Sequence, residues 1–381
     1  MMQTFTANAK KITPGIILCI AIVLIGILIS DLLGGWINQL QGLPEASKSP
    51  ISSIFVAIVI GLLIRNLIGL HETFQAGVTF SIKFILKFGI ILLGIRLSFI
   101  DVIKLGAWGI PIILICVMTG LIVTLWFTNR LNQSHRLGSL IAAGTGICGV
   151  TAIVAITPGI KANDEEVAYA IANITLFGII AMFAYPYLAF YLFSDDPIRA
   201  GLFLGTSIHE TAQVAGASLI YFQAFGIDQV IETATITKLT RNVLIIAVVP
   251  LLSYYYLKNR NRNSSTSKAD AKKWYQLIPL FVIGFLIVAV IRSIGDAGVD
   301  YQGLAFGTLQ EDTWKNLTSS ISTFSSTYLL GIAMAGVGLS TNLAVFKGLG
   351  YKPFIIGLVA SITVTLVALT MVTLLGGLIQ L

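Results

Sequence analysis

The sequence predicts an all-α polytopic membrane protein with ten or eleven transmembrane helices. Hydrophobic residues make up 56% of the 381 residues and charged residues only 11%, whereas about a quarter of a soluble domain is charged. Apolar runs of about 20 residues, each long enough to cross a bilayer as a helix, recur along the whole chain. They are continuous rather than alternating, which argues against membrane strands.

Eleven spans can be placed in order along the chain. They lie near 13–33, 50–70, 74–98, 106–129, 137–158, 165–192, 197–222, 230–257, 274–294, 318–340 and 353–379. The first run is too long for a signal-peptide core and no small-residue cleavage site follows it, so we expect a retained span. The sequence leaves open whether 137–158 and 197–222 cross the membrane fully or re-enter.

The basic residues indicate the orientation. The polar segment 258–273 holds six of the 24 Lys and Arg residues and is predicted to be a cytoplasmic linker between two helical halves of one transporter domain, 1–381. With the N-terminus inside, 14 basic residues fall in inner segments and 6 in outer ones. This asymmetry favours a cytoplasmic N-terminus and an external C-terminus.

An internal repeat is also visible. The segments "GIRLSFIDVIKLGAWGIPIIL" from Gly94 and "GVGLSTNLAVFKGLGYKPFIIGL" from Gly336 share G-x-x-L-S, a lysine, glycines, a proline and a new apolar run. They close the third and the tenth span, so the count gives them opposite orientations. Matched segments in opposite orientations predict the inverted-repeat architecture of secondary transporters, although chance similarity between apolar segments is the alternative.

The stretch "AAGTGICGVTAIVAITPG", from Ala142 to Gly159, predicts an interrupted helix. Three glycines fall within six residues, and irregular backbone at membrane depth is tolerated where it lines a cavity. A break near Gly144 to Gly149 would turn the positive end of a half-helix toward an anion. Close packing of helices through small residues is the alternative.

A second unusual stretch is "GTSIHETAQVAG", from Gly205 to Gly216, which holds one of the three histidines. "HETAQ" is similar to the zinc motif H-E-x-x-H, but Gln213 replaces the second histidine, so a metalloprotease is not expected. On a continuous helix His209, Gln213 and Gly216 would share one face. A charged residue such as Glu210 at membrane depth indicates a functional site, and a structural polar network is the alternative.

Cations outnumber acids at membrane depth. Lys83 and Lys87 lie in the third span, and Lys238 and Arg241 lie in the eighth, beside Asn242. This excess predicts an anionic counterpart, part of which would be the substrate. For Arg241, pairing with Glu210 or Glu232 is the structural alternative.

Other classes of protein lack support. No Walker A motif, no pair of adjacent intramembrane aspartates and no arginine ladder occurs. The three cysteines have no ligand spacing, and the net charge of +7 is distributed as a topology signal, so we expect no nucleic acid partner. We predict no enzymatic activity, no cofactor and no metal.

At these residues the chain resembles a known family. "GIILLGIRLSF", "AAGTGICGVTAIVAITPGIKANDEEVAYAIANITLFG", "LFLGTSIHETAQVAGA" and "ATITKLTRNVLI" look like the signature segments of the YeiH-type sulfate exporter family of bacterial membrane proteins. The similarity runs from about Pro50 to the C-terminus. It implies a bacterial inner-membrane protein, distantly similar to bile-acid/sodium symporters and cation/proton antiporters, whose folds have inverted repeats and crossing broken helices.

Together these features predict a secondary transporter that exports a small anion such as sulfate, sulfite or a related sulfur oxyanion. An importer of a small organic anion and a non-transporting scaffold or sensor are the alternatives. A proton or sodium as coupling ion, the lipid bilayer, and a homo-oligomer are the other partners considered. The predicted substrate-binding residues are Gly144, Thr145, Gly146, Cys148, Gly149, Thr151, His209, Glu210, Gln213, Lys238, Arg241 and Asn242.

The orientation is testable with topology reporters. A reporter fused at Ser265 should be cytoplasmic and one at Gly303 external, because the first position lies in the basic linker and the second in an acidic outer loop. Finding both reporters on one side of the membrane would remove the eleven-span arrangement.

Overall fold

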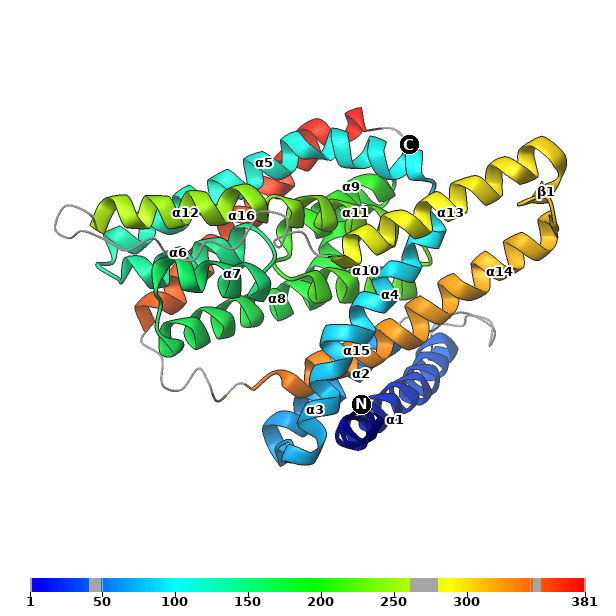
Figure 1. Ribbon diagram of the computed structural model, residues 1–381, viewed down its shortest axis with the longest axis horizontal. Coiled ribbons are helices and arrows are strands. Elements are labelled where there is room, and N and C mark those ends of the chain that lie inside the picture. Colours follow the sequence, from blue (N-terminus) through cyan, green and yellow to red (C-terminus); the bar gives the residue numbers. More distant parts are fainter. Residues whose placement is uncertain are drawn as a thin grey trace. The chain divides into compact units, whose positions relative to one another are not determined.

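The computed structural model describes residues 2–40, 49, 51–260, 280–342, 344 and 351–379. The described chain is almost entirely helical, which confirms the predicted all-α polytopic fold (Figure 1). Two short antiparallel strands, β1 (Leu304–Ala305) and β2 (Leu309–Gln310), form the one small sheet of the described residues. The helix α12 continues to Arg260, and the rest of the predicted linker, 261–273, lies outside the described residues.

The helices agree with the predicted spans. Eight described helices are long and apolar enough to cross a membrane: Lys10–Gln39, Glu72–Arg96, Val102–Arg130, Glu165–Phe193, Gln229–Tyr254, Leu280–Gln302, Glu311–Ser340 and Tyr351–Leu378. Of the three remaining predicted spans, 50–70 corresponds to a shorter apolar helix, Ser53–Ile68. The other two, 137–158 and 197–222, are each interrupted near the middle.

The chain divides into two compact units. The first comprises Met1–Ile103, Ser218–Glu232 and Leu280–Ala344, and the second comprises Lys104–Ala217, Thr233–Pro279 and Val345–Leu381. The prediction of one transporter domain over the whole chain stays a prediction.

Close approaches of glycine hold the first unit together. Its elements are α1 (Met2–Leu40), α2 (Ser53–Leu63), η1 (Ile64–Ile68), α3 (Glu72–Phe80), η2 (Ser81–Ile85), α4 (Leu86–Leu93), η3 (Gly94–Arg96), α13 (Leu280–Gln302), α14 (Glu311–Thr323), η5 (Phe324–Leu329) and α15 (Leu330–Ser340). Gly15 of α1 packs directly on Gly77 of α3, and Gly61 of α2 packs on Gly338 of α15. Small residues at these crossings allow the backbones to touch, as is common between membrane helices.

The two spans that lead into the predicted repeat segments each contain a π-helical turn at a similar place. Gly336 follows Gly94 by 242 residues, and the same offset moves η2 onto 323–327, which overlaps η5 over 324–327. The contacts are reciprocal as well: α3 and η2 pack on α15, while α14 and η5 pack on α4. The early part of each span therefore meets the late part of the other, which agrees with the opposite orientations that the sequence predicts.

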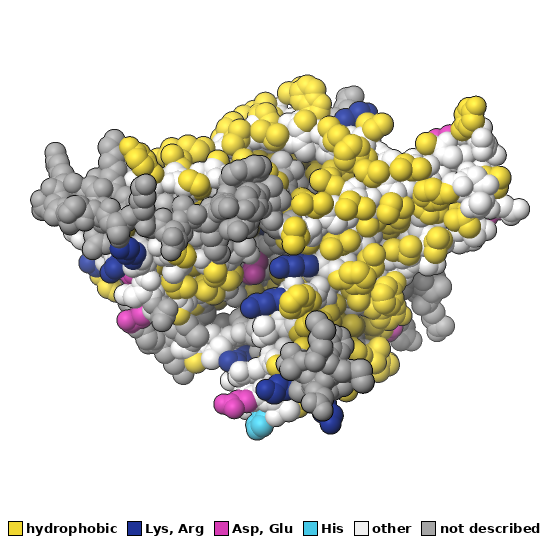
Figure 2. All heavy atoms as spheres, in the orientation of Figure 1, with side chains coloured by type: hydrophobic (Ala, Val, Ile, Leu, Met, Phe, Trp, Pro, Cys, Tyr) yellow, Lys and Arg dark blue, Asp and Glu magenta, His cyan; other side chains and the backbone are white. Residues whose placement is uncertain are grey.

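Helix α13 exposes one apolar stripe. Its exposed large side chains include Leu280, Ile283, Ile287, Ile291 and Ile294, which recur every three or four residues, while Phe285 and Ala289 are buried. Figure 2 shows apolar side chains over much of the visible face along α13. A stripe of this kind is favourable against lipid rather than water.

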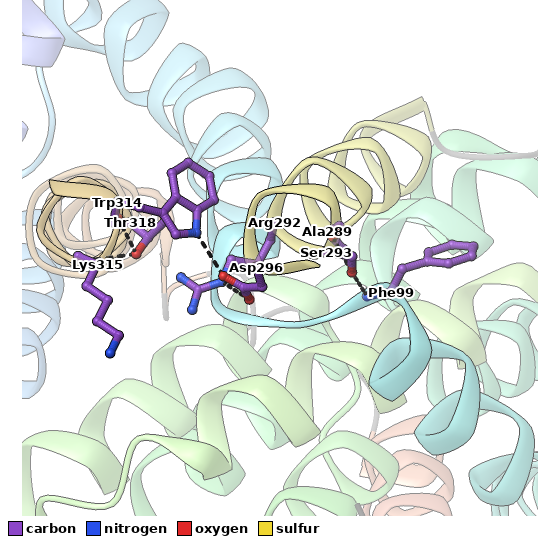
Figure 3. A network of polar contacts seen from close by, with 8 residues as sticks. All are labelled: Phe99, Ala289, Arg292, Ser293, Asp296, Trp314, Lys315 and Thr318. Carbon is purple, nitrogen blue, oxygen red and sulfur yellow. Dashed lines mark hydrogen bonds and ion pairs between the residues drawn. The ribbon is translucent and has the colours of Figure 1, made fainter. Parts of the chain in front are cut away.

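A polar network joins α13 to α14 and to the start of α5 (Phe99–Arg130) (Figure 3). Asp296 accepts hydrogen bonds from Arg292 Nε at 2.6 Å and from Trp314 Nε1 at 2.8 Å. One turn away, Ser293 Oγ accepts the backbone N–H of Phe99 at 2.7 Å. This bond satisfies a donor at the helix start that has no partner within the helix.

The second unit is built on the long helices α8 (Asp164–Phe193) and α16 (Tyr351–Leu375) and most of α5. Its other elements are α6 (His135–Gly146), α7 (Val150–Ile160), α9 (Pro197–Ser207), most of α10 (Thr211–Phe225) and of α11 (Gln229–Val243), α12 (Ile245–Arg260) and η7 (Gly376–Leu378). Its core packs aliphatic side chains of α5, α6, α7, α8, α12 and α16 together. Asn173 of α8 donates to Pro353 O of α16 at 2.9 Å and so joins these two helices.

Candidate functional site

The first interruption lies where the glycine-rich stretch predicts it. Helix α6 ends at Gly146 and α7 begins at Val150. Gly149, between them, has φ +69° and ψ −126°, a conformation open to glycine but strained for other residues. Gly144 and Gly146 face Ile174 and Leu121 instead, so these two glycines serve close packing.

The second interruption falls at Ile208–Glu210, between α9 and α10. Ile208 is extended, with φ −83° and ψ 138°. The expectation that His209 shares a helical face with Gln213 and Gly216 is therefore wrong, because His209 lies in the break before α10 begins. Thr206 and Ser207 bond back to carbonyls of their own helix, and no glycine or proline in "TSIHET" marks the break.

Lys238 of α11 reaches both interruptions. Its ammonium donates to Ile147 O at 3.0 Å, to Ile208 O at 2.9 Å and to His209 O. An ammonium has three hydrogens, and all three are used. Lys238 is completely buried, so no donor remains for the direct contact with an anion that the sequence predicts.

Arg241, one helical turn later, reaches the same two interruptions. Its Nε donates to Gly146 O at 2.9 Å and its Nη2 to Thr145 O, at the end of α6. Its Nη1 donates to Thr206 O at 2.7 Å and to Ile208 O at 3.2 Å, at the end of α9. Four of the five N–H groups of the guanidinium thus bind backbone carbonyls.

These two cations cap the half-helices α6 and α9. The last carbonyls of a helix have no partner within it and form the negative end of its dipole. Here those carbonyls are buried, and Lys238 and Arg241 supply both the hydrogen bonds and the opposite charge. The alternative of a pair between Arg241 and Glu210 is also wrong, because no ion pair joins Arg241 to a carboxylate among the described residues.

The opposite ends, where α7 and α10 begin, lie side by side. A Cβ placed on Gly149 would stand 3.2 Å from Glu210 Cβ. Glu210 directly precedes α10, and its carbonyl accepts Val214 N at 3.0 Å. The first N–H groups of both half-helices have no partner within their helices and carry positive dipole charge.

This pair of helix starts is accessible, unlike the capped ends. Glu210 and Thr211 are half-buried and Thr151 is exposed. Among the described residues the Glu210 carboxylate has neither a hydrogen bond nor an ion pair, and Lys238 is the charge that acts on it. An accessible carboxylate therefore stands beside two positive helix ends.

Asn242 of α11 is a buried residue that contacts the start of α10. It is 2% exposed, and its Nδ2 donates to Thr211 Oγ1 at 3.0 Å. Its Oδ1 has no hydrogen-bond partner. Because a threonine hydroxyl can donate or accept, either end of this amide can turn toward a ligand.

The remaining predicted residues anchor the break to its neighbours. His209 Nε2 lies 3.0 Å from Ser361 Oγ of α16, and Gln213 Nε2 donates to Thr175 O of α8 at 3.2 Å. Cys148 is buried within the first break. Ser361 and Thr211 are members of the site that the sequence did not single out: Ser361 sits in an ordinary apolar run, "GLVASITVT", without any signal.

The structure thus brings the predicted residues together around the two interruptions, in one unit. Gly149, Glu210 and Asn242 lie at the accessible helix starts, and Thr151 is exposed in the first turn of α7. Lys238, Arg241 and the carbonyl of Thr145 lie at the buried helix ends. Lys83 and Lys87 are exposed residues of the first unit and are not part of this site.

The family profile and the similar proteins that match this chain agree on one family of membrane proteins. The sequence profile described as conserved hypothetical protein 698 matches residues 14–357. A UPF0324 membrane protein of Bacillus anthracis is 32% identical over 328 residues, which cover 85% of this chain and 87% of that protein. Similar UPF0324 membrane proteins of Streptococcus agalactiae serotype V and Corynebacterium glutamicum are 29% and 30% identical, over 96% and 98% of this chain and 98% and 96% of their own lengths.

Removal of Arg241 should destabilise the protein. Arg241→Gln leaves buried carbonyls at the ends of both α6 and α9 without partners, at roughly 1–3 kcal/mol each, so we expect a loss of at least about 3 kcal/mol. Arg241→Lys should lose less. The melting temperature of the purified variants measures this, with Arg130→Gln, at an exposed arginine, as the control. An unchanged melting temperature with lost sulfate binding would show that Arg241 is a ligand instead.

Gly149 should tolerate no side chain. Gly149→Ala combines a strained backbone, about 1–3 kcal/mol, with displacement of Glu210. Gly303→Ala is the matched control, because Gly303 has φ +70° with nothing within 4 Å of a new Cβ. We expect the larger fall in melting temperature for Gly149→Ala. Equal losses would mean that the packing against Glu210 contributes nothing.

Proposed function

We propose, from the premise that the chain belongs to the family described as conserved hypothetical protein 698, that it is a secondary transporter for small anions. The observation that carries this proposal is the pair of interrupted helices, whose C-terminal and N-terminal ends at the breaks have different surroundings. Their C-terminal ends are buried and capped by Lys238 and Arg241, and their N-terminal ends are accessible beside Glu210. Discontinuous helices whose N-terminal ends face an anionic group are a recurrent design of secondary transporters.

The charges of the site favour an anion. Lys238 and Arg241 contribute two positive charges and Glu210 one negative charge. Two helix C-terminal ends add roughly −0.5 each and two N-terminal ends roughly +0.5 each. The sum is about +1, so a bound anion moves the site toward neutrality. The accessible helix starts also supply N–H donors of the kind that bind oxyanions.

The substrate we favour is sulfate, sulfite or a related sulfur oxyanion, exported across the bacterial inner membrane with the N-terminus on the cytoplasmic side. A proton or sodium is the coupling ion, and no cofactor or enzymatic step is needed. Import of a small organic anion is the second candidate, which the same helix starts would serve. A scaffold or sensor that does not transport is the third.

Flux in proteoliposomes tests the proposal. Radiolabelled sulfate and sulfite should enter vesicles that contain the purified protein faster than empty vesicles, and small carboxylates test the second candidate. Asn242→Asp places a negative charge at the start of α10 without changing its size, and should weaken anion affinity at least about ten-fold.

The same change at an exposed position of the second unit, Asn129→Asp, is the matched control and should leave flux unchanged. If none of the anions moves, transport is refuted and the scaffold or sensor remains. Equal flux in Asn242→Asp and Asn129→Asp would show that the anion does not bind at the start of α10.

A further inference from the structure

Glu210 is the acidic residue of the site. Its carboxylate makes no contact with the described residues that would stabilise the fold. It is half-buried, packed against the Gly149 backbone, and free of hydrogen bonds and ion pairs to described residues. The charged and titratable groups around it are Lys238 and Arg241 from α11, Cys148 from the first break and His209 on its own segment. Lys238 and Arg241 are committed to carbonyls, and His209 bonds Ser361.

The charge balance distinguishes anions by their valence. With Glu210 ionised the site carries about +1, as summed above. A monovalent anion neutralises it. A divalent anion leaves about −1 and places two negative charges beside an ionised carboxylate, where like charges repel. Protonation of Glu210 removes this repulsion and returns the sum to zero.

We infer that Glu210 takes up one proton when a divalent oxyanion binds, and none when a monovalent anion binds. This inference rests on the proposed function, since it assumes that anions bind at the starts of α7 and α10. The proton comes from bulk water and forms an O–H bond on the carboxylate, and no other bond changes. Asn242, 2% exposed with an unpartnered amide oxygen, is the independent sign that this place is built for a ligand.

The transported charge follows from this stoichiometry. Sulfate with one proton and a monovalent anion alone both carry one net negative charge across the membrane. An interior-negative potential drives either of them outward, whereas an acidic exterior drives only the divalent anion inward.

Proton uptake by the purified full-length protein is the direct test. Sulfate and methanesulfonate are the probes, because both are tetrahedral sulfur oxyanions and differ in charge. In weak buffer with a pH indicator, wild type should take up one proton per sulfate bound and none per methanesulfonate. Sulfate affinity should fall by up to about ten-fold per pH unit as the carboxylate ionises, and methanesulfonate affinity should not.

Two variants locate the proton. Glu210→Gln should bind sulfate without proton uptake and with a flat pH profile, and Glu165→Gln, at an exposed carboxylate of α8, should behave as wild type. Sulfate binding without proton uptake in wild type, or unchanged uptake in Glu210→Gln, overturns the inference while the transport proposal stands. If neither probe binds or moves, both fail. The comparison of the two probes in wild type holds even if Glu210→Gln does not fold.

Discussion

The capping of two helix ends by Lys238 and Arg241 is the interaction on which the second unit depends. Interrupting a helix inside a membrane exposes carbonyls that lipid cannot satisfy. Two interruptions meet here, and one short stretch of α11 serves both, with donors to Thr145, Gly146, Ile147, Thr206, Ile208 and His209. The same arrangement explains why an excess of cations is tolerated at this depth, since each positive charge faces the negative end of a helix.

The positions of the charged side chains at the helix ends determine the net charge of the site. Lys238 and Arg241 outweigh the negative charge of the C-terminal ends, and Glu210 offsets the positive charge of the N-terminal ends of α7 and α10, so the site keeps a net charge of about +1. Glu210 is the carboxylate beside them, held against Gly149. The charge of the accessible site is thus determined in part by Lys238 and Arg241, which a ligand at the helix starts does not need to contact.

Local patterns predicted much of this structure. Apolar runs located the spans, and the glycines of 142–159 located the first break, because backbone preference is a property of neighbouring residues. The second break was not located within 197–222, since no glycine or proline stands at Ile208–Glu210 to signal it. The partners of Lys238 and Arg241 lie 29 to 96 residues away along the chain, and Ser361 is farther still from His209. From the sequence, the excess of cations therefore indicated direct contact with an anionic substrate. In the structure, backbone carbonyls are the partners of Lys238 and Arg241.

The π-helical turns η2 and η5 bear on the history of the chain. A π turn accommodates one residue more than an α-helical turn, so each marks the place of an additional residue. These two overlap when the spans that lead into the repeat segments are aligned with the offset of 242 residues. If the two segments descend from one ancestral half, the additional residue was already present before that half was duplicated. Relatives that diverged after the duplication should then retain both turns together, even where the surrounding side chains have changed.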